Sequence, residues 1–467
     1  MRSTPPEAHD TSFNTYETTV LIVPAGAKSA YQSADVWKNF VTIREIKDGD
    51  KFEKDGIYYT IVSVEDKTVE VTFKGETYDE VDNEYQGDVV IPQTVSYEDV
   101  DFTVVGVGEK ALFGCDNIRR LSVPLTVSYF DKGTINSETL RELYWNSTSR
   151  FSKSIFVNPD VATNMILYIA KEAECDYAVN VVRNGVAEYV VLTDALPLQI
   201  TTGFKAKKVS YTRHFDKVTV PRKPGGWESI VLPFDVQSFV SEEAGEIAPF
   251  NSGKSGAKPF MLAQMTGSGF AVATEMKANV PYILVMPNSE VYSEEDNISG
   301  EVMFYAESAS GVTVYATADA KKAAGKEFDL VPTYEEVERD LAVYALNEGM
   351  YNDFIPGSAF VSGLRIVKPF EAYASVESKP ANAKTYFVIG GNDSATDIMR
   401  LYDDMFDGLN IDSRDGVLYI QSPKAQNIGL YGSDGRLVRI LRLTEGSNTV
   451  TGLSKGVYVI GKKKVGV

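Results

Sequence analysis

The chain has 467 residues and a formal net charge of −19 at pH 7, with a pI near 4.7. A surface this acidic argues against nucleic acid or an anionic membrane as the main partner, because both carry negative charge. The hydrophobic content of 43% is enough for packed cores, which excludes a disordered chain. The two cysteines, Cys115 and Cys175, are too few for a disulfide scaffold, and we expect Cys115 to be free and buried.

Two further features of the composition bear on the fold and on the membrane. Tyrosine, with 26 residues, outnumbers tryptophan, with 3, and aromatic and β-branched residues favour sheets over helices. No apolar run reaches the roughly 20 residues that a helix needs to cross a bilayer. We therefore expect a chain rich in strands without a membrane-spanning segment.

The first segment of the chain combines a strand with a short helix. The apolar run Val20–Val23 stops at Pro24, and Gly26 follows as a turn residue. Ser29 is placed to cap a short helix that reaches Trp37, whose ring we expect to pack with Phe40. We interpret residues 1–48 as the end of a truncated repeat array.

Residues 52–105 alternate apolar and polar side chains, as strands with one buried face do. The pairs Asp55-Gly56 and Lys74-Gly75 supply residues that tight hairpin turns require. This pattern predicts β-hairpins that lead into, and cap, the segment beginning near residue 100.

A short apolar motif then recurs at nearly constant spacing. Leu121-Ser122-Val123 is followed 22 residues later by Leu143-Tyr144-Trp145, and 24 residues after that by Leu167-Tyr168-Ile169. This spacing is typical of a leucine-rich solenoid, in which neighbouring turns stack and share one core. We predict that the flanking apolar residues line one core on adjacent parallel strands: Leu121, Val123, Leu143, Trp145, Leu167 and Ile169.

Beyond residue 200 the repeat disappears, and short strands bounded by Gly and Pro replace it. The clearest strands are 226–234, 280–285 and 369–374, and residues 341–355 resemble a hairpin around Asn347-Glu348-Gly349. Many short strands with few helices indicate an antiparallel sandwich. A polar stretch near residues 390–397 reads as a linker to a small all-β segment.

The expected fold is mostly β: a short leucine-rich-repeat solenoid with β-hairpin caps, an antiparallel β-sandwich, and a small C-terminal β-sandwich module. The expected domains are 1–48 (end of the truncated repeat array), 49–199 (hairpin cap and repeats), 200–392 (β-rich sandwich) and 398–467 (C-terminal β-module).

The sequence offers little for catalysis. It has two histidines, His9 and His214, and we expect His214 to be an exposed strand residue. A histidine-dependent triad or a zinc site needs more partners, and no phosphate-binding loop, dinucleotide pattern or EF-hand is found. We predict no cofactor, no metal site and no enzymatic activity. Carboxylates are abundant, so a glycosidase-type pair from distant positions stays open as an alternative.

The repeats offer a candidate binding surface. If Leu143 and Trp145 point inward, alternation along the strand turns Glu142 and Tyr144 outward. The same argument exposes Arg120 and Tyr168 on the neighbouring strands. Tyrosine and arginine are favoured anchors in binding interfaces. We predict that Arg120, Glu142, Tyr144 and Tyr168 form a ligand-binding face, unless the β-rich region folds against it and buries it.

Two stretches carry a resemblance to a known family. Gly108–Ile118 with Leu121–Pro124 resembles the BspA-like leucine-rich repeat of Bacteroidetes surface proteins. Leu21–Gly26 with Trp37–Phe40 is similar to the segment that closes such arrays. The resemblance implies a leucine-rich-repeat fold and a position on the cell surface.

The C-terminal end carries a second resemblance. Residues 401–467 resemble the C-terminal sorting module of the type IX secretion route, through Asp434-Gly435-Arg436, Gly452–Tyr458 and the terminal lysines. Asp393-Ser394-Ala395 resembles the short O-glycosylation motif of Bacteroidetes, which makes Ser394 a candidate modification site. Export is then expected through a signal peptide outside this numbering, to the extracellular space or the outer-membrane surface.

Three hypotheses for function follow. The first is a secreted or cell-surface, adhesin-like binding protein whose partner is a host protein or a glycan. The second is a glycan-processing hydrolase that uses carboxylates of the central region. The third is a structural spacer that displays other domains. The sequence does not specify an oligomeric state.

Overall fold

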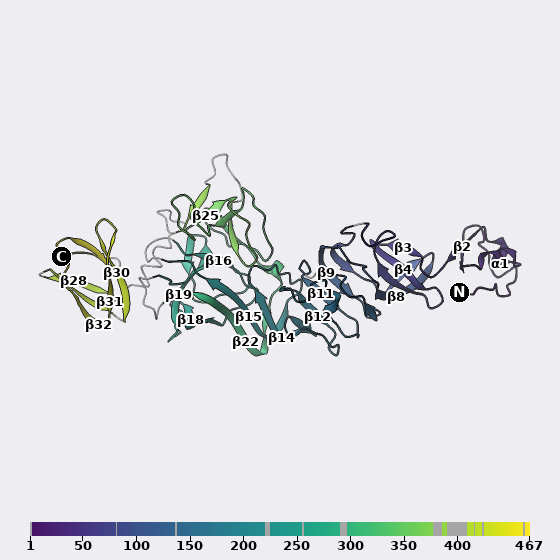
Figure 1. Cartoon of the computed structure of the whole chain (residues 1–467), viewed down its shortest axis with the longest axis horizontal. Coiled ribbons are helices and arrows are strands. Elements are labelled where there is room, and N and C mark those ends of the chain that lie inside the picture. Colours follow the sequence, from purple (N-terminus) through teal and green to yellow (C-terminus); the bar gives the residue numbers. More distant parts are fainter. Residues whose placement is uncertain are drawn as a thin grey trace. The chain divides into compact units, whose positions relative to one another are not determined.

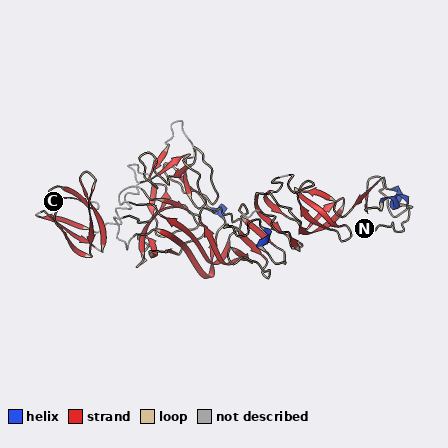
Figure 2. Cartoon of the chain, in the orientation of Figure 1, coloured by secondary structure: helices blue, strands red, loops and turns tan. Residues whose placement is uncertain are grey.

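The computed structural model describes residues 2–80, 82–135, 138–219, 225–254, 256–289, 297–376, 385–389, 409–414, 416–422, 425–460 and 463–467. The chain is mostly β and contains several sheets with a few short helices, as predicted (Figures 1 and 2). It forms two compact units, Met1–Gly185 and Val186–Val467. The finer division into four domains stays a prediction. None of the helices in the described ranges has the length and apolar character that crossing a bilayer requires.

The first segment of unit 1 contains β1 (Val20–Pro24), α1 (Lys28–Ser33), η1 (Trp37–Asn39) and β2 (Thr42–Ile46). Strands β1 and β2 pair in parallel, and Trp37 stacks with Phe40 as predicted. The predicted cap at Ser29 is wrong, because α1 begins before it and no side chain of its N-cap residue caps it. The carboxylate of Glu45 on β2 instead accepts the backbone N–H of Lys28 at 2.7 Å.

The next sheet is built from hairpins, as predicted. Its strands are β3 (Lys51–Lys54), β4 (Ile57–Ser63), β5 (Thr68–Thr72), β7 (Thr94–Tyr97), β8 (Val100–Val107) and β10 (Tyr129–Phe130). Asp55 and Gly56 join β3 to β4 with φ angles of 53° and 80°, the positive values of a turn that follows strand twist. The hairpin turn predicted at Lys74-Gly75 is wrong, because β5 pairs in parallel with β8.

The repeated motif forms a row of parallel strands. These are β6 (Gln86–Val90), β9 (Asn117–Val123), β11 (Glu142–Trp145), β12 (Ile166–Ile169) and β13 (Val181–Arg183), with η2 (Lys153–Ile155) between β11 and β12. Leu121 lies opposite Leu143, which lies opposite Leu167. All six predicted inward residues are buried in the same hydrophobic core, so that prediction is confirmed.

Unit 2 begins with a large sheet whose strands follow the spatial order β14, β15, β22, β17, β18, β19, β21, β16. Their bounds are β14 (Val186–Thr193), β15 (Phe204–Phe215), β16 (Glu228–Ile230), β17 (Ser238–Ser241), β18 (Gly245–Pro249), β19 (Lys258–Thr266), β21 (Tyr282–Val285) and β22 (Gly300–Val314), with β20 (Gly269–Val272) paired to β19. The pairs β14–β15 and β18–β19 are parallel. The long strands β15 and β22 pair antiparallel.

A second sheet of unit 2 shares a core with part of the first. It contains β23 (Asp329–Pro332), β24 (Tyr344–Leu346), β25 (Ala359–Ser362), β26 (Ala372–Ser375) and β27 (Tyr386–Val388), and η3 (Thr317–Asp319) precedes it. Met261 and Ile283 of the large sheet pack in one cluster with Tyr344 and Phe360. The hairpin expected within 341–355 is wrong, because β24 pairs with β25 and the intervening loop carries only an isolated bridge.

The C-terminal segment folds as two small sheets around one core. The strands are β28 (Asn410–Arg414), β29 (Val417–Ser422), β30 (Gln426–Gly432), β31 (Leu437–Leu443), β32 (Gly446–Val450), β33 (Val457–Ile460) and β34 (Lys463–Gly466). Leu418 of one sheet and Leu430 of the other are fully buried in that core. Gly435, with φ of 79°, makes the turn between β30 and β31. Ser394, the candidate modification site, lies outside the described residues.

Candidate functional site

The predicted binding face lies on strands β9, β11 and β12 of unit 1; we call Arg120, Glu142, Tyr144 and Tyr168 the tyrosine face. The rings of Tyr144 and Tyr168 stack with centroids 4.4 Å apart and planes 4° from parallel. The two residues are directly opposite in the parallel register, and both are partly exposed. The sequence therefore predicted correctly that these rings form one aromatic row.

Glu142 differs from the prediction, because its side chain is buried instead of exposed. It points to the same side of β11 as Tyr144, two residues away. The hydroxyl of Tyr168 donates to Oε1 of Glu142 at 3.1 Å, and the hydroxyl of Tyr144 donates to the same atom at 3.3 Å. Glu142 therefore holds the two rings in place and is not an open contact for a ligand.

Arg120 takes a partner that sequence reasoning missed. Its guanidinium pairs with Asp88 of β6 at 2.5 Å, and its side chain is 25% exposed. Asp88 lies opposite Arg120 in the parallel register of β6 and β9. Asp88 precedes the apolar run Val89–Ile91, so extending the repeat register back by one strand would have found it. The tyrosine face thus has a cation and a carboxylate beside its aromatic row.

Burial and charge both act on the tyrosine hydroxyls. Burial, and then the negative charge of Glu142, raises the pKa of Tyr144 to about 12. The same causes raise the pKa of Tyr168 further. Both phenols therefore stay neutral at physiological pH, and the row presents uncharged aromatic rings with fixed orientation. Such rings suit stacking on a sugar or contact with an apolar side chain.

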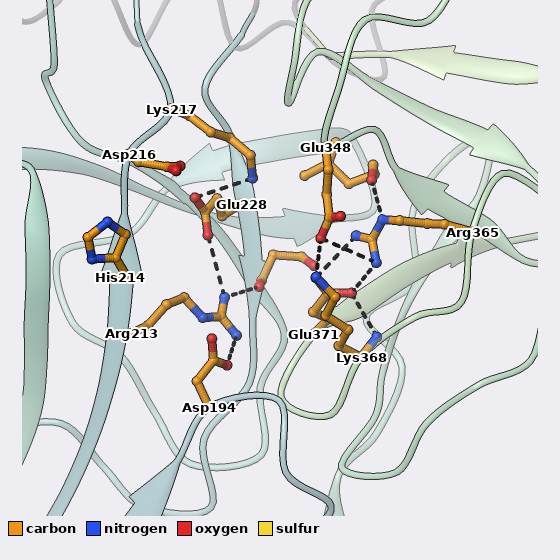
Figure 3. A pocket seen from close by; sticks show the side chains of 12 residues that line it. Asp194, Arg213, His214, Asp216, Lys217, Glu228, Glu348, Arg365, Lys368 and Glu371 are labelled. Carbon is orange, nitrogen blue, oxygen red and sulfur yellow. Dashed lines mark hydrogen bonds and ion pairs between the residues drawn. The ribbon is translucent and has the colours of Figure 1, made fainter.

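A second candidate site lies in unit 2, where charged side chains from two groups face one cavity of about 310 Å³ (Figure 3). We call it the charged pocket. One group comes from β15, β16 and the residue after β14, and the other from the segments that follow β24 and β25. The lining residues are Asp194, Arg213, His214, Asp216, Lys217, Glu228, Ser229, Leu346, Glu348, Arg365, Lys368 and Glu371.

The first group is organised by Arg213, whose side chain is only 5% exposed. Its guanidinium donates to Asp194 at 3.0 Å, to the hydroxyl of Tyr211 at 2.8 Å and to the backbone carbonyl of Ser229 at 2.8 Å. Beside it, Lys217 pairs with Glu228 at 3.2 Å. The negative charges around Arg213 outweigh the burial that would lower its pKa, so its pKa is raised and it stays charged.

The second group is organised by Arg365. Its two terminal nitrogens bind both oxygens of Glu371, at 2.7 and 3.1 Å, in the bidentate geometry that is strongest for this pair. Lys368 donates to Glu348 at 2.7 Å. Burial alone would raise the pKa of Glu348, but the hydrogen bond from Lys368 and the charges of Arg365, Lys368 and Lys217 outweigh it and lower that pKa.

These contacts limit the chemistry of the charged pocket. A glycosidase needs one carboxylic acid whose pKa is raised so that it can donate a proton. Glu348 shows the opposite shift. His214 is exposed, as predicted, and lies 3.3 Å from Glu301. In the part of the chain that the structure describes, no group of three or more His, Cys, Asp or Glu residues is placed to hold a metal ion.

Sequence reasoning missed the charged pocket, although one signal was present. Tyr211, Arg213 and Phe215 alternate along β15 and therefore share one face of the sheet. An arginine between two aromatic residues on a core-facing row must be buried, and a buried arginine needs acceptors. Its acceptors come from distant positions, including the carbonyl of Phe370 at 3.4 Å, and no local pattern identifies those.

Cys115 is free and buried, as predicted, and Cys175 is also free. Burial raises the pKa of the Cys115 thiol to about 12, so it is an inert core residue. Comparison of the chain with protein-family models, with curated proteins and with solved structures finds no match.

Proposed function

We propose that the chain is a secreted or cell-surface binding protein of the adhesin type, without catalysis, that recognises a host protein or a glycan through the tyrosine face. The observation that carries the proposal is the stacked pair Tyr144 and Tyr168, partly exposed and held by the buried Glu142. Rings that are fixed before binding lose little conformational entropy when a ligand arrives. Arg120 and Asp88 at the edge would orient a polar or charged partner.

We also propose that the parallel strands of unit 1 are the strand row of a short leucine-rich-repeat solenoid. The register offsets support this: Arg120 pairs with Glu142, and Glu142 pairs with Ile166, which are steps of 22 and 24 residues. Strands β1 and β2 pair with the same step of 22, from Val20 to Thr42. A repeated step in two separate sheets supports a repeat as the origin of both. Sequence resemblance supports a surface location, which fractionation of the native cells would test; recovery only from cytoplasm would contradict it.

A glycan and host-matrix array tests the binding proposal. Four proteins should be compared: the wild type, the double variant Tyr144→Ala/Tyr168→Ala, the double variant Tyr144→Phe/Tyr168→Phe, and Tyr129→Ala as a matched control on β10. We expect loss of binding only in the alanine double variant, because phenylalanine keeps the ring. Equal binding by all four would move the site elsewhere. An array with no wild-type binding would favour the spacer hypothesis.

A glycan hydrolase in the central region is the second candidate, because the charged pocket gathers several carboxylates. Against it stands the lowered pKa of Glu348, which makes this residue a poor proton donor. Release of sugar from a panel of nitrophenyl glycosides, abolished by Glu228→Gln or Glu348→Gln, would establish the hydrolase and contradict the binding-only proposal.

A further inference from the structure

The cations of the charged pocket are all neutralised by carboxylates of the same pocket. The closest ion pairs join Arg213 to Asp194 at 3.0 Å, Lys217 to Glu228 at 3.2 Å, Arg365 to Glu371 at 2.7 Å and Lys368 to Glu348 at 2.7 Å. An anionic ligand would have to break one of these pairs and leave a carboxylate without its partner, which is costly. An apolar ligand would remove water from the charges and offer nothing in return.

Hydrogen-bonding capacity nevertheless remains on both sides of the cavity. Among the described residues, Oε1 of Glu348 accepts a hydrogen bond from Lys368, while Oε2 accepts none. The ammonium group of Lys217 has three N–H donors and lies beside one carboxylate, that of Glu228. Lys217 lies close enough to lower the pKa of Glu348, so the acceptor and the donor serve the same space (Figure 3).

We infer that the charged pocket binds a neutral, polyhydroxylated ligand, such as one residue of a glycan. A hydroxyl group is a donor and an acceptor at once, so adjacent hydroxyls can donate to Glu348 and accept from Lys217. Hydrogen bonds to charged groups are stronger than those between neutral groups. The ion pairs fix the charged groups before binding, and the volume of about 310 Å³ lies at the lower end of small-molecule sites. This site is independent of the tyrosine face.

Calorimetric titration and ligand-observed NMR on the full chain test the inference. The neutral probes are methyl α-mannoside, methyl β-galactoside and N-acetylglucosamine. Glucuronate, glucosamine and cyclohexanol supply an anion, a cation and a ring that lacks adjacent hydroxyls. We expect at least one neutral sugar to saturate the chain and cyclohexanol not to bind. Tighter binding of glucuronate or glucosamine, or no neutral sugar bound, would overturn the inference.

Matched variants locate the site. Glu348→Gln should weaken binding of the neutral sugar by about ten-fold or more, because a charged acceptor is lost. Glu275→Gln removes the carboxylate of an exposed pair, Glu275–Lys277 at 2.9 Å, outside the pocket and should leave binding unchanged. Lys217→Met is the second pocket variant, and thermal unfolding of each variant separates loss of a contact from loss of the fold. Unchanged binding in both folded pocket variants would overturn the assignment.

Discussion

Tyr144 and Tyr168 stack at 4.4 Å with nearly parallel rings although 24 residues separate them in the chain. The parallel register of β11 and β12 places them opposite each other, and Glu142 accepts a hydrogen bond from each hydroxyl. A fully buried carboxylate is costly unless it is hydrogen-bonded. The two hydroxyls are therefore part of what stabilises Glu142, and Glu142 in turn fixes the ring orientation.

This relationship predicts how the phenol of Tyr144 titrates. Burial and then the charge of Glu142 raise its pKa to about 12. Glu142→Gln keeps an oxygen acceptor but removes the charge, so the pKa of Tyr144 should fall while burial holds it above the ordinary value of 10.0. Tyrosine-selective NMR over a pH series measures this shift. Tyr129, whose hydroxyl donates to Glu70 at 2.6 Å, is the internal control and should not change. An unaltered Tyr144 titration would contradict the coupling.

The shared core of the parallel strands predicts a large cost for removing Trp145. Its side chain is 3% exposed, and its ring packs edge-on against Phe151 with centroids 5.3 Å apart. Trp145→Ala should lower the free energy of unfolding by about 3–5 kcal/mol, as other buried aromatic truncations do. Urea unfolding followed by amide hydrogen exchange in β9, β11 and β12 would measure it. Leu125→Ala, at a 55% exposed position, should change stability by less than about 0.5 kcal/mol.

Local and periodic features could be predicted from the sequence, and long-range polar contacts could not. The step from Leu121 to Leu143 predicted the parallel row, because inward residues of stacked strands must repeat together. Asp55-Gly56 predicted its turn, because few residues tolerate two positive φ angles. The burial of Glu142 was missed, because alternation assigns a side of the sheet and says nothing of what covers it. The acceptors of Arg213 were missed for the same reason.

Arg213 is predicted to be the critical polar residue of unit 2. Arg213→Ala would leave Asp194, the hydroxyl of Tyr211 and the carbonyl of Ser229 without their shared donor. Removing one partner of a buried ion pair costs about 3–5 kcal/mol, so unit 2 should unfold at lower denaturant concentration. Arg213→Lys should rescue only part of the loss, because an ammonium group cannot reproduce the planar fork.

The matched control for Arg213 is Arg436→Ala, since the Arg436 side chain is 89% exposed. Surface substitutions of this kind usually change stability by less than about 0.5 kcal/mol. Denaturant unfolding of both variants, with hydrogen exchange in β15 and β16 as the local readout, would separate the effects. Equal stability of Arg213→Ala and the wild type would mean that the network around Arg213 contributes nothing net.

Glu84 predicts a pH dependence of stability with a definite sign. Both oxygens of its carboxylate are buried, and burial raises its pKa above the ordinary 4.5. Below the unfolded pKa, the group is protonated in both states and has no effect. As the pH rises through the raised folded pKa, the folded state must ionise a buried group, so stability falls. Glu84→Gln should therefore raise the melting temperature at about pH 7.5 and change it little near pH 4. Glu109→Gln, at an exposed position, is the control and should show no such difference. A Glu84→Gln variant that is less stable than the wild type at neutral pH would show that the charged carboxylate stabilises the fold.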